Sequence, residues 1–193
     1  NCGYRHMVYE TNDNLYKDPW LVAVYEATSG WADETDFYLS LAAENKLRIL
    51  DLGCGTGLLC NAYAGHEHEV VGVDPAAEML QVARQQPHAG SIQWVHSTGD
   101  HCDFNIMFDL IVMIRHAFQC LHSDEDTLRV LRNVAGHLGA GKTFVFESRN
   151  PNINWPGEWD GASDVYSSGP DSFQISTRVL SSDSEFVTFE HTY

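Results

Sequence analysis

The sequence predicts a doubly wound α/β fold, in which helices cover both faces of a mostly parallel sheet. Between residues 47 and 148, apolar runs of strand length alternate with segments of helical periodicity, as expected for parallel strands joined by crossover helices. The second observation is a glycine-rich loop directly after the first apolar run, at the place where such sheets bind ligands. A chain of 193 residues is long enough for a single domain with a substantial core.

The part of the chain before the sheet, residues 1–46, is expected to be helical. Asp18 and Pro19 match an N-cap followed by proline at the first helical position, and Gly30 can end this helix. A second helix is expected over 33–45. Its inward face is predicted to contain Phe37, Leu41 and Ala42.

The glycine-rich loop follows a short apolar run that contains Asp51. Glycines stand at three alternating positions, namely Gly53, Gly55 and Gly57. A side chain at either of the first two positions would occupy space that a ligand touching the backbone needs. Residues 56–65 are then expected to form a helix whose amino end faces the same place.

The spacing of these glycines separates two families of cofactor sites. The dinucleotide fingerprint G-x-G-x-x-G needs a glycine at its sixth position, where this chain has Leu58 counting from Gly53 and Cys60 counting from Gly55. The frame therefore argues against a nucleotide-linked oxidoreductase. A glycine-rich turn that holds no ligand is the structural alternative.

A second apolar strand, over 70–73, ends at Asp74, 23 residues after Asp51. An acid at that strand end of a doubly wound sheet reaches the ribose of an adenosine ligand, and a carboxylate can accept from both hydroxyls. An N-cap is the alternative role of this acid. Pro75 fits the first position of the next helix, which is expected to end at residue 86 with Met79 on its inner face.

The remaining strands of the sheet are predicted over 92–96, 108–114 and 142–148. Ser123 and the acids after it are typical of a helix start, and Gly139 and Gly141 are expected to close that helix. Its inward face is predicted to contain Leu128, Leu131, Ala135 and Leu138.

The periodicity weakens after residue 148. Residues 149–170 are expected to form a long loop with two tryptophans, Trp155 and Trp159. Alternating residues over 173–180 and 185–192 then predict an antiparallel hairpin.

The glycine spacing after Asp51, together with the acid Asp74, resembles motif I and its following acid in the class I S-adenosylmethionine (SAM)-dependent methyltransferases, whose core is Rossmann-like. The resemblance covers residues 47–148. It implies SAM as the cofactor and S-adenosylhomocysteine as the product, with Asp100 near the adenine amino group; a surface turn is the alternative for that acid. The cofactor-binding residues that the resemblance implies are Asp51, Gly53, Cys54, Gly55, Gly57, Asp74, Pro75, Met79, Gly99, Asp100, His101, Ile114 and Arg115.

The segments His116-Ala117-Phe118-Gln119 and Arg149-Asn150-Pro151 are similar to those of a bacterial group of small-molecule-type members. Arg115 departs from the small residue expected beside them, which implies a different site entrance. Such members usually continue past the hairpin with another helix and an antiparallel strand pair, whereas this chain stops at Tyr193, so we expect either a fragment or a shortened sheet. In this family the N-terminal helical segment often closes over the cofactor. The resemblance therefore implies four candidate lid residues, with core packing as their alternative role: Tyr9, Tyr16, Trp20 and Tyr25.

The resemblance implies in-line methyl transfer from the sulfonium of SAM to a small-molecule acceptor, for which the enzyme aligns the acceptor and excludes water. His116 is the candidate general base, since an imidazole can be neutral near pH 7; hydrogen bonding without proton transfer is its alternative role. Arg149 is the second candidate catalytic residue. Arg115 or Arg149 would hold an acceptor carboxylate or pair with surface acids. A SAM-binding module without catalysis, such as a sensor, is the other function that the sequence leaves open.

The composition argues against several partners and sites. Eleven basic and 27 acidic residues give a formal net charge of −16. The sequence lacks the basic track that nucleic acid binding requires, so no nucleic acid partner is expected. The methyl acceptor is expected to be a small neutral or cationic molecule. The chain has no run of eighteen apolar residues, so no membrane partner is expected. The five cysteines are scattered, odd in number and without a C-x-x-C pair, which favours reduced thiols in a cytoplasmic protein and no metal site.

Overall fold

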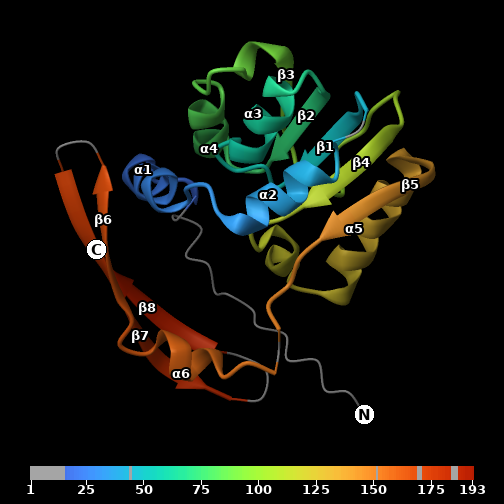
Figure 1. The fold of residues 1–193 in the computed structure, drawn as a ribbon. Helices are drawn as coiled ribbons and strands as arrows, with labels where there is room; N and C mark the ends of the chain where they lie inside the picture. Colours follow the sequence, from blue (N-terminus) through green and yellow to red (C-terminus); the bar gives the residue numbers. More distant parts are fainter. Residues whose placement is uncertain (1–15, 44, 151, 169–170, 184–186) are drawn as a thin grey trace. The chain divides into compact units, whose positions relative to one another are not determined.

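The computed structural model describes residues 16–43, 45–150, 152–168, 171–183 and 187–193 (Figure 1). The contacts divide the chain into two compact units, and each is described by itself. The larger unit is Asp13–Glu147, and the other contains Ser148–Tyr193. Within the described residues, no helix has the length and apolar character needed to cross a membrane.

The larger unit is built on a five-stranded sheet in which every pair of neighbouring strands is parallel. Its strands are β1 (Arg48–Leu52), β2 (Glu69–Asp74), β3 (Ile92–His96), β4 (Phe108–Met113) and β5 (Leu138–Phe146). The spatial order is β3-β2-β1-β4-β5, and Leu50 lies opposite Val71 on one side and Ile111 on the other. The order reverses between β1 and β4, so their carboxyl ends flank the crevice in which open α/β sheets bind ligands. The predicted doubly wound fold is confirmed.

Helices cover both faces of the sheet, because successive side chains of each strand point to opposite faces. On one face, Ile49 and its neighbours pack against Leu59 and Tyr63 of α3 (Leu58–Gly65). On the other face, Leu50 and Leu52 join a cluster with α5 (Asp124–His137). Two further helices are α1 (Pro19–Thr28) and α4 (Ala77–Ala83), which share a small cluster of their own.

The two N-terminal helices begin where predicted, but the second is shorter than predicted and buries a different face. The Asp18 carboxylate accepts hydrogen bonds from two backbone N–H groups of α1, and Pro19 follows it. The helix α2 (Asp33–Ser40) buries Tyr38, whereas Phe37 is 56% exposed and Leu41 is also exposed. The prediction of an inward Phe37 and Leu41 is therefore wrong. The side of α2 that carries Tyr38 faces inward because its hydroxyl and carbonyl groups both bond to core elements.

The helix α5 begins as predicted, since the Ser123 hydroxyl accepts a hydrogen bond from the third N–H of the helix. Its buried residues are Val130, Val134 and His137, whereas Leu128 is 49% exposed, so the predicted inward face was wrong. Gly139 and Gly141 do not close the helix. The chain passes directly from α5 into β5 at Leu138, and an irregularity in the β4–β5 pairing accommodates the two glycines.

The second unit is an antiparallel sheet of three strands, β6 (Ser163–Ser168), β7 (Asp171–Ser182) and β8 (Val187–Thr192), preceded by the short helix α6 (Trp155–Trp159). The predicted hairpin corresponds to β7 and β8, with Thr177 opposite His191. The strand β6 lies in the segment that we predicted to be a loop. Its sequence, Ser163–Ser168, is polar at most positions, so it lacks the apolar alternation by which strands are recognised.

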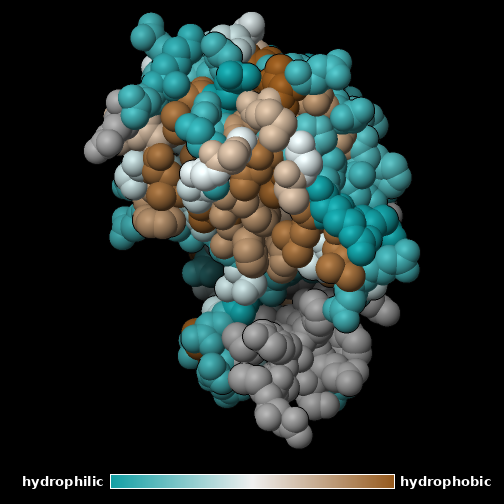
Figure 2. Space-filling view, turned by 90° about the vertical axis from the view of Figure 1, so that its right-hand side faces the viewer, coloured by the Kyte–Doolittle hydropathy of each residue, from teal (hydrophilic) through white to brown (hydrophobic). Residues whose placement is uncertain are grey.

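In the larger unit, β5 is an edge strand of the described sheet, and much of it is exposed. Figure 2 looks onto the side of the molecule that carries β5 and shows hydrophobic residues gathered in the middle of this face. Exposed apolar residues of the larger unit include Ile106, Met107, Leu128 and Phe146.

Candidate functional site

The glycine-rich loop connects β1 to α3 at the switch point of the sheet. The N–H groups of Gly53 and Cys54 both donate to the Val73 carbonyl, at 2.8 and 3.0 Å, and hold the loop against the end of β2. Gly57 has φ +82° as the residue before α3, and a Cβ there would lie 2.6 Å from the Trp94 ring. Both the backbone angle and the packing therefore require glycine at this position.

The space beside Gly53 is filled by the protein itself. A Cβ at this position would lie 2.6 Å from the Ala117 Cβ, so the glycine allows the close approach of the segment after β4. Gly53 also lines the pocket described below, and the expectation that a side chain there would take a ligand's space stays a prediction. At Gly55, which has φ +55°, a Cβ would meet only Tyr25, at an ordinary distance of 3.6 Å from its hydroxyl oxygen. Strain at Gly55 would therefore come from the backbone angle.

Asp74, at the end of β2, is the residue that organises the loop. Its two carboxylate oxygens accept hydrogen bonds from the N–H groups of Gly55 and Ala76, each at 2.8 Å. Burial raises the pKa of this carboxyl, and the two N–H donors oppose that shift. Each oxygen keeps a second acceptor site. The position at the strand end is as predicted, and contact with a ribose stays a prediction.

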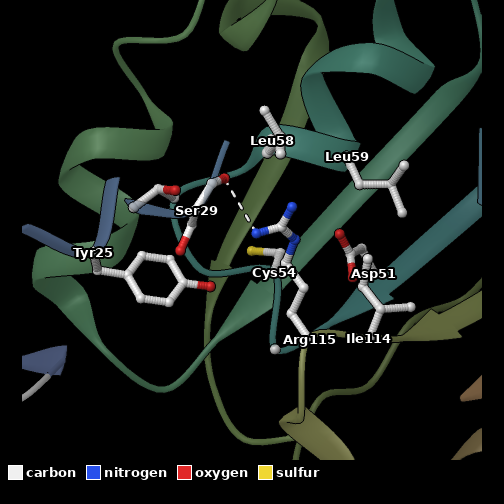
Figure 3. A pocket seen from close by; sticks show the side chains of 10 residues that line it. Tyr25, Ser29, Asp51, Cys54, Leu58, Leu59, Ile114 and Arg115 are labelled. Atoms are coloured by element: carbon white, nitrogen blue, oxygen red, sulfur yellow. Dashed lines mark hydrogen bonds between the residues drawn. The ribbon is translucent and has the colours of Figure 1, made fainter. Parts of the chain in front are cut away.

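A pocket open to solvent lies between this loop and the first helix (Figure 3). Its walls are the loop and the start of α3, Tyr25 and Ser29 from the N-terminal part, and Ile114 and Arg115 after β4. Burial raises the pKa of Tyr25. Tyr25 is thus the predicted lid residue that lines this pocket, whereas Trp20 is 56% exposed and Tyr9 lies outside the described residues.

Asp51 supplies a buried carboxylate to the pocket. Only 2% of the residue is exposed, and its Oδ2 accepts a hydrogen bond from the Cys60 thiol at 3.3 Å. Among the residues that the structure describes, none donates a hydrogen bond to Asp51 Oδ1. Burial raises the pKa of this carboxyl to about 7, with nearby Asp74 adding to the shift and Arg115 opposing it. An unpaired buried carboxylate oxygen costs free energy that a cationic ligand would recover.

Arg115 places a guanidinium in the same pocket (Figure 3). Its nitrogens donate to the Ser29 carbonyl at 3.1 Å, to the Gly30 carbonyl at 2.7 Å and to the Thr35 hydroxyl at 3.4 Å. The side chain therefore links the end of β4 to the connection between α1 and α2. The pocket is thus lined by an acidic side chain from β1 and a basic side chain from the turn after the neighbouring strand β4.

The backbone after β4 forms a turn in which two consecutive residues are left-handed. Arg115 has φ +52° and His116 has φ +68°, and the Ala117 N–H donates to the Ile114 carbonyl at 3.1 Å. This is the geometry of a type I′ turn, which glycine and asparagine favour. Neither central residue is of that kind, and strained backbone of this sort concentrates at functional sites. The sequence carries no local sign of this turn.

A carboxylate that the sequence analysis passed over lies beside His116. Glu147 directly follows β5, and its Oε1 accepts a hydrogen bond from the His116 backbone N–H at 3.1 Å. The same oxygen lies 3.6 Å from His116 Nδ1, and Oε2 accepts from the Tyr38 hydroxyl at 2.8 Å. Burial lowers the pKa of His116, against the opposing effect of Glu147 and Glu34. Asp51 and Asp74 were identified because each is an acid at the end of a strand. The same criterion applied to the fifth strand would have identified Glu147.

The other predicted cofactor residues have partners within the protein. The Asp100 carboxylate accepts from the Thr98 hydroxyl at 2.7 Å and pairs with Arg129 and His101, which lowers its pKa to about 2. The Gly99 carbonyl accepts from the Asn133 side chain. Contact of Asp100, Gly99 and His101 with an adenine stays a prediction.

Met79 is 1% exposed and packs with Val22 and Ala76, so its thioether lies in the core that joins α1 to α4. The Pro75 carbonyl oxygen is 3.0 Å from His96 Nε2. Ile114 and Cys54 line the pocket with Arg115.

Arg149, the second predicted catalytic residue, belongs to the other unit. Its guanidinium lies 5.8 Å from the Trp155 ring centre and 5.2 Å from that of Trp159, and burial lowers its pKa to about 10. A role for Arg149 beside His116 stays a prediction.

The described cysteines, Cys54, Cys60, Cys102 and Cys120, are free thiols, and Cys2 lies outside the described residues. In the described ranges, no three His, Cys, Asp or Glu side chains gather in a way that could hold a metal ion.

Comparisons with known proteins agree on one family. Residues 49–141 match the methyltransferase domain family. The cypemycin N-terminal methyltransferase of Streptomyces sp. is 32% identical over 108 residues, which are 53% of this chain and 42% of that protein. The ubiquinone biosynthesis O-methyltransferase of Bradyrhizobium sp. (strain ORS 278) is 32% identical over 115 residues, which are 58% of this chain and 44% of that protein. The chain thus spans less than half the length of these curated relatives.

Solved structures show the same fold at low identity. A SAM-dependent methyltransferase from Clostridium acetobutylicum aligns with a TM-score of 0.64 and 18% identity, over 90% of this chain and 78% of that one. A SAM-bound amino pentose methyltransferase from Micromonospora echinaspora aligns with a TM-score of 0.66 and 22% identity, over 83% and 69% of the two chains.

Proposed function

We propose that this chain, whose residues 49–141 form a domain of the class I SAM-dependent methyltransferases, binds SAM in the pocket beside the glycine-rich loop and transfers its methyl group to a small-molecule acceptor. The relatives are named as a cypemycin N-terminal methyltransferase, an O-methyltransferase of ubiquinone biosynthesis and an amino pentose methyltransferase. These names support methyl transfer to a small-molecule acceptor.

The observation that carries the proposal is the buried carboxylate of Asp51. Asp51 lines the pocket, and its Oδ1 accepts no hydrogen bond from the described residues. The methionine part of SAM carries an α-ammonium group, whose N–H donors would satisfy this oxygen. A hydrogen bond to a charged group contributes roughly 1.5–3 kcal/mol.

Arg115 would bind the other charge of the same group. The guanidinium lies in the pocket with donors directed at backbone carbonyls, and a carboxylate is a stronger acceptor than a carbonyl. An acid and a base that line one pocket are complementary to an α-amino acid, which carries both charges. This complementarity distinguishes SAM from a neutral ligand of similar size.

The adenosine part is proposed to lie at the end of β2. The Asp74 carboxylate has a remaining acceptor site on each oxygen for the ribose hydroxyls, and it fixes the loop through Gly55. These features support the proposed binding mode.

Bound SAM supplies a methyl group already activated on a sulfonium. The protein then has to hold the acceptor in line with the carbon–sulfur bond and to exclude water, and such positioning accounts for a large part of the rate in transfers of this kind. An acceptor nucleophile that carries a proton must lose it. We propose His116, at the end of β4 and with a side chain 48% exposed, as the base that takes this proton.

Calorimetry with SAM, S-adenosylhomocysteine and NADH tests the cofactor assignment directly. We expect saturable binding of the first two and none of NADH. Heat with NADH and none with SAM would overturn the proposal. A screen of metabolite extracts for transfer of a labelled methyl group then tests catalysis, and binding of SAM without transfer to any extract would favour a non-catalytic SAM-binding module.

A further inference from the structure

The environment of His116 carries an inference that rests on the proposed function and deepens it. The imidazole is approached from one side by the Glu147 carboxylate, with Oε1 3.6 Å from Nδ1. The same oxygen accepts the backbone N–H of His116 at 3.1 Å. This oxygen thus forms a hydrogen bond with the backbone N–H of His116 and places its charge close to the ring of the same residue, just beyond hydrogen-bond distance.

The carboxylate is itself held in place. The Tyr38 hydroxyl donates to Glu147 Oε2 at 2.8 Å, and Tyr38 is 6% exposed. The Tyr63 hydroxyl in turn donates to the Tyr38 carbonyl at 2.7 Å, and Tyr63 is fully buried. The position of Glu147 is therefore set by the core through α2, while its Oε1 remains directed at His116.

The position of this carboxylate bears on which ring nitrogen carries the proton. The negative charge of the carboxylate favours a proton on the nearby nitrogen, Nδ1, by electrostatic attraction. Nε2 then carries the lone pair. Because the His116 side chain is 48% exposed, Nε2 is available to an acceptor molecule.

We propose that Glu147 is a positioning residue that holds the His116 imidazole in the Nδ1–H tautomer, so that Nε2 can take the proton of the methyl acceptor. In the step, the acceptor's electron pair forms the bond to the methyl carbon, the carbon–sulfur bond breaks and its electrons stay on sulfur. The acceptor's N–H or O–H proton moves to Nε2. The resulting imidazolium is stabilised by the negative charge of Glu147.

The charged groups around the ring allow a matched test. Glu147 from the end of β5 and Glu34 from α2 both favour the charged ring, whereas Arg115 from the same turn disfavours it. Glu34 is exposed and acts on the ring through its charge, so Glu34→Gln removes an equal charge without disturbing the hydrogen bonds of Glu147. Glu147→Gln removes the charge and keeps one amide oxygen, which can accept from the His116 N–H, while the amide NH2 replaces Oε2 and can donate to the Tyr38 hydroxyl oxygen.

The probe is the ¹⁵N-labelled imidazole, observed by long-range ¹H–¹⁵N correlation spectra of the protein without SAM. The chain has 10 histidines, so the His116 signals are identified by their loss in His116→Asn. We expect the Nδ1–H tautomer to predominate in the parent chain. In Glu147→Gln the His116 pKa should fall clearly more than in Glu34→Gln, and in Glu147→Ala the tautomer preference should be lost.

An Nε2–H tautomer in the parent chain, or equal pKa changes in Glu147→Gln and Glu34→Gln, would overturn the inference. Backbone ¹H–¹⁵N spectra of each variant show whether the fold persists. Calorimetry with SAM on the same variants separates this inference from the proposed function. We expect the SAM dissociation constant of Glu147→Gln to stay within about twofold of the parent value, since Glu147 does not line the pocket. A protein that binds no SAM at all would contradict the proposed function and leave the tautomer result intact.

Discussion

Binding of SAM should release a proton from Asp51. The free carboxyl has a pKa of about 7, raised from 3.8 mainly by burial. It therefore binds protons that an ordinary carboxyl would have lost at neutral pH. An ammonium group placed against Oδ1 favours the ionised form, and an opposite charge at this distance lowers a carboxyl pKa by roughly 1–3 units. The pocket should thus take up SAM and give up a proton together.

The size of this release follows from the two protonation states. With a pKa of about 7, roughly nine tenths of the free sites are protonated at pH 6 and about one tenth at pH 8. If binding lowers the pKa by roughly 1–3 units, the release is about 0.4 to 0.9 proton per SAM at pH 6. At pH 8 it falls to about 0.1. The affinity for SAM should accordingly rise between pH 6 and pH 8.

Titration calorimetry measures the release as the slope of binding heat against the ionisation enthalpy of the buffer. The parent chain should give the stated slope at pH 6 and almost none at pH 8. Asp51→Asn should give a slope near zero at both, with an affinity lower by about 10- to 100-fold through loss of one charged hydrogen bond. A parent slope of zero at pH 6, or the same slope in Asp51→Asn, would refute the assignment of the ammonium group to this oxygen.

The other predictions concern the loop, the turn and the candidate base. Asp74→Ala should raise the SAM dissociation constant at least tenfold. It should also leave the N–H groups of Gly55 and Ala76 unpaired, and chemical denaturation should show a free energy of unfolding lower by about 1–3 kcal/mol for each of them. Gly55→Val, at φ +55°, should abolish SAM binding in calorimetry, and normal binding would mean that the loop is not the cradle. Arg115→Ala should speed limited proteolysis between α1 and α2, because two carbonyls there lose their donor. His116→Ala should leave SAM affinity nearly unchanged and lower turnover by up to about 10²–10⁴-fold; a SAM-bound structure with the ring far from the sulfonium would contradict its role as a base.

The sequence was sufficient for the sheet and for the place of the pocket, because both depend on local patterns. Continuous apolar runs predicted β1, β2 and β4, and the acids Asp51 and Asp74 at strand ends predicted where the loop would lie. The helix faces were harder. In α5 the apolar side chain of Leu128 is exposed while His137 is buried, because His137 bonds to the backbone of the segment before β4. A hydropathy pattern does not contain such a contact.

The acceptor side was less predictable for a related reason. Glu147 stood near the end of a predicted strand, where the strand-end rule could have marked it, but its role depends on partners 31 and 109 residues away, His116 and Tyr38. Only the tertiary fold brings these side chains together. Likewise, the left-handed conformations of Arg115 and His116 are imposed by the groups that hold them, since neither residue type favours positive φ as glycine does.

The turn after β4 also limits how this protein can change over evolution. Arg115 and His116 share one peptide unit, yet the first side chain faces the pocket of the loop and the second faces Glu147. A replacement at either position must tolerate a left-handed backbone, which narrows the choice largely to glycine, asparagine and aspartate or to residues with compensating contacts. A mutation that adapts position 116 to a new acceptor also alters the backbone that presents Arg115. With the roles proposed for Arg115 and His116, selection on the acceptor and selection on the cofactor would act on the same two residues, and a change of acceptor that keeps the cofactor should arise more readily from positions outside this turn.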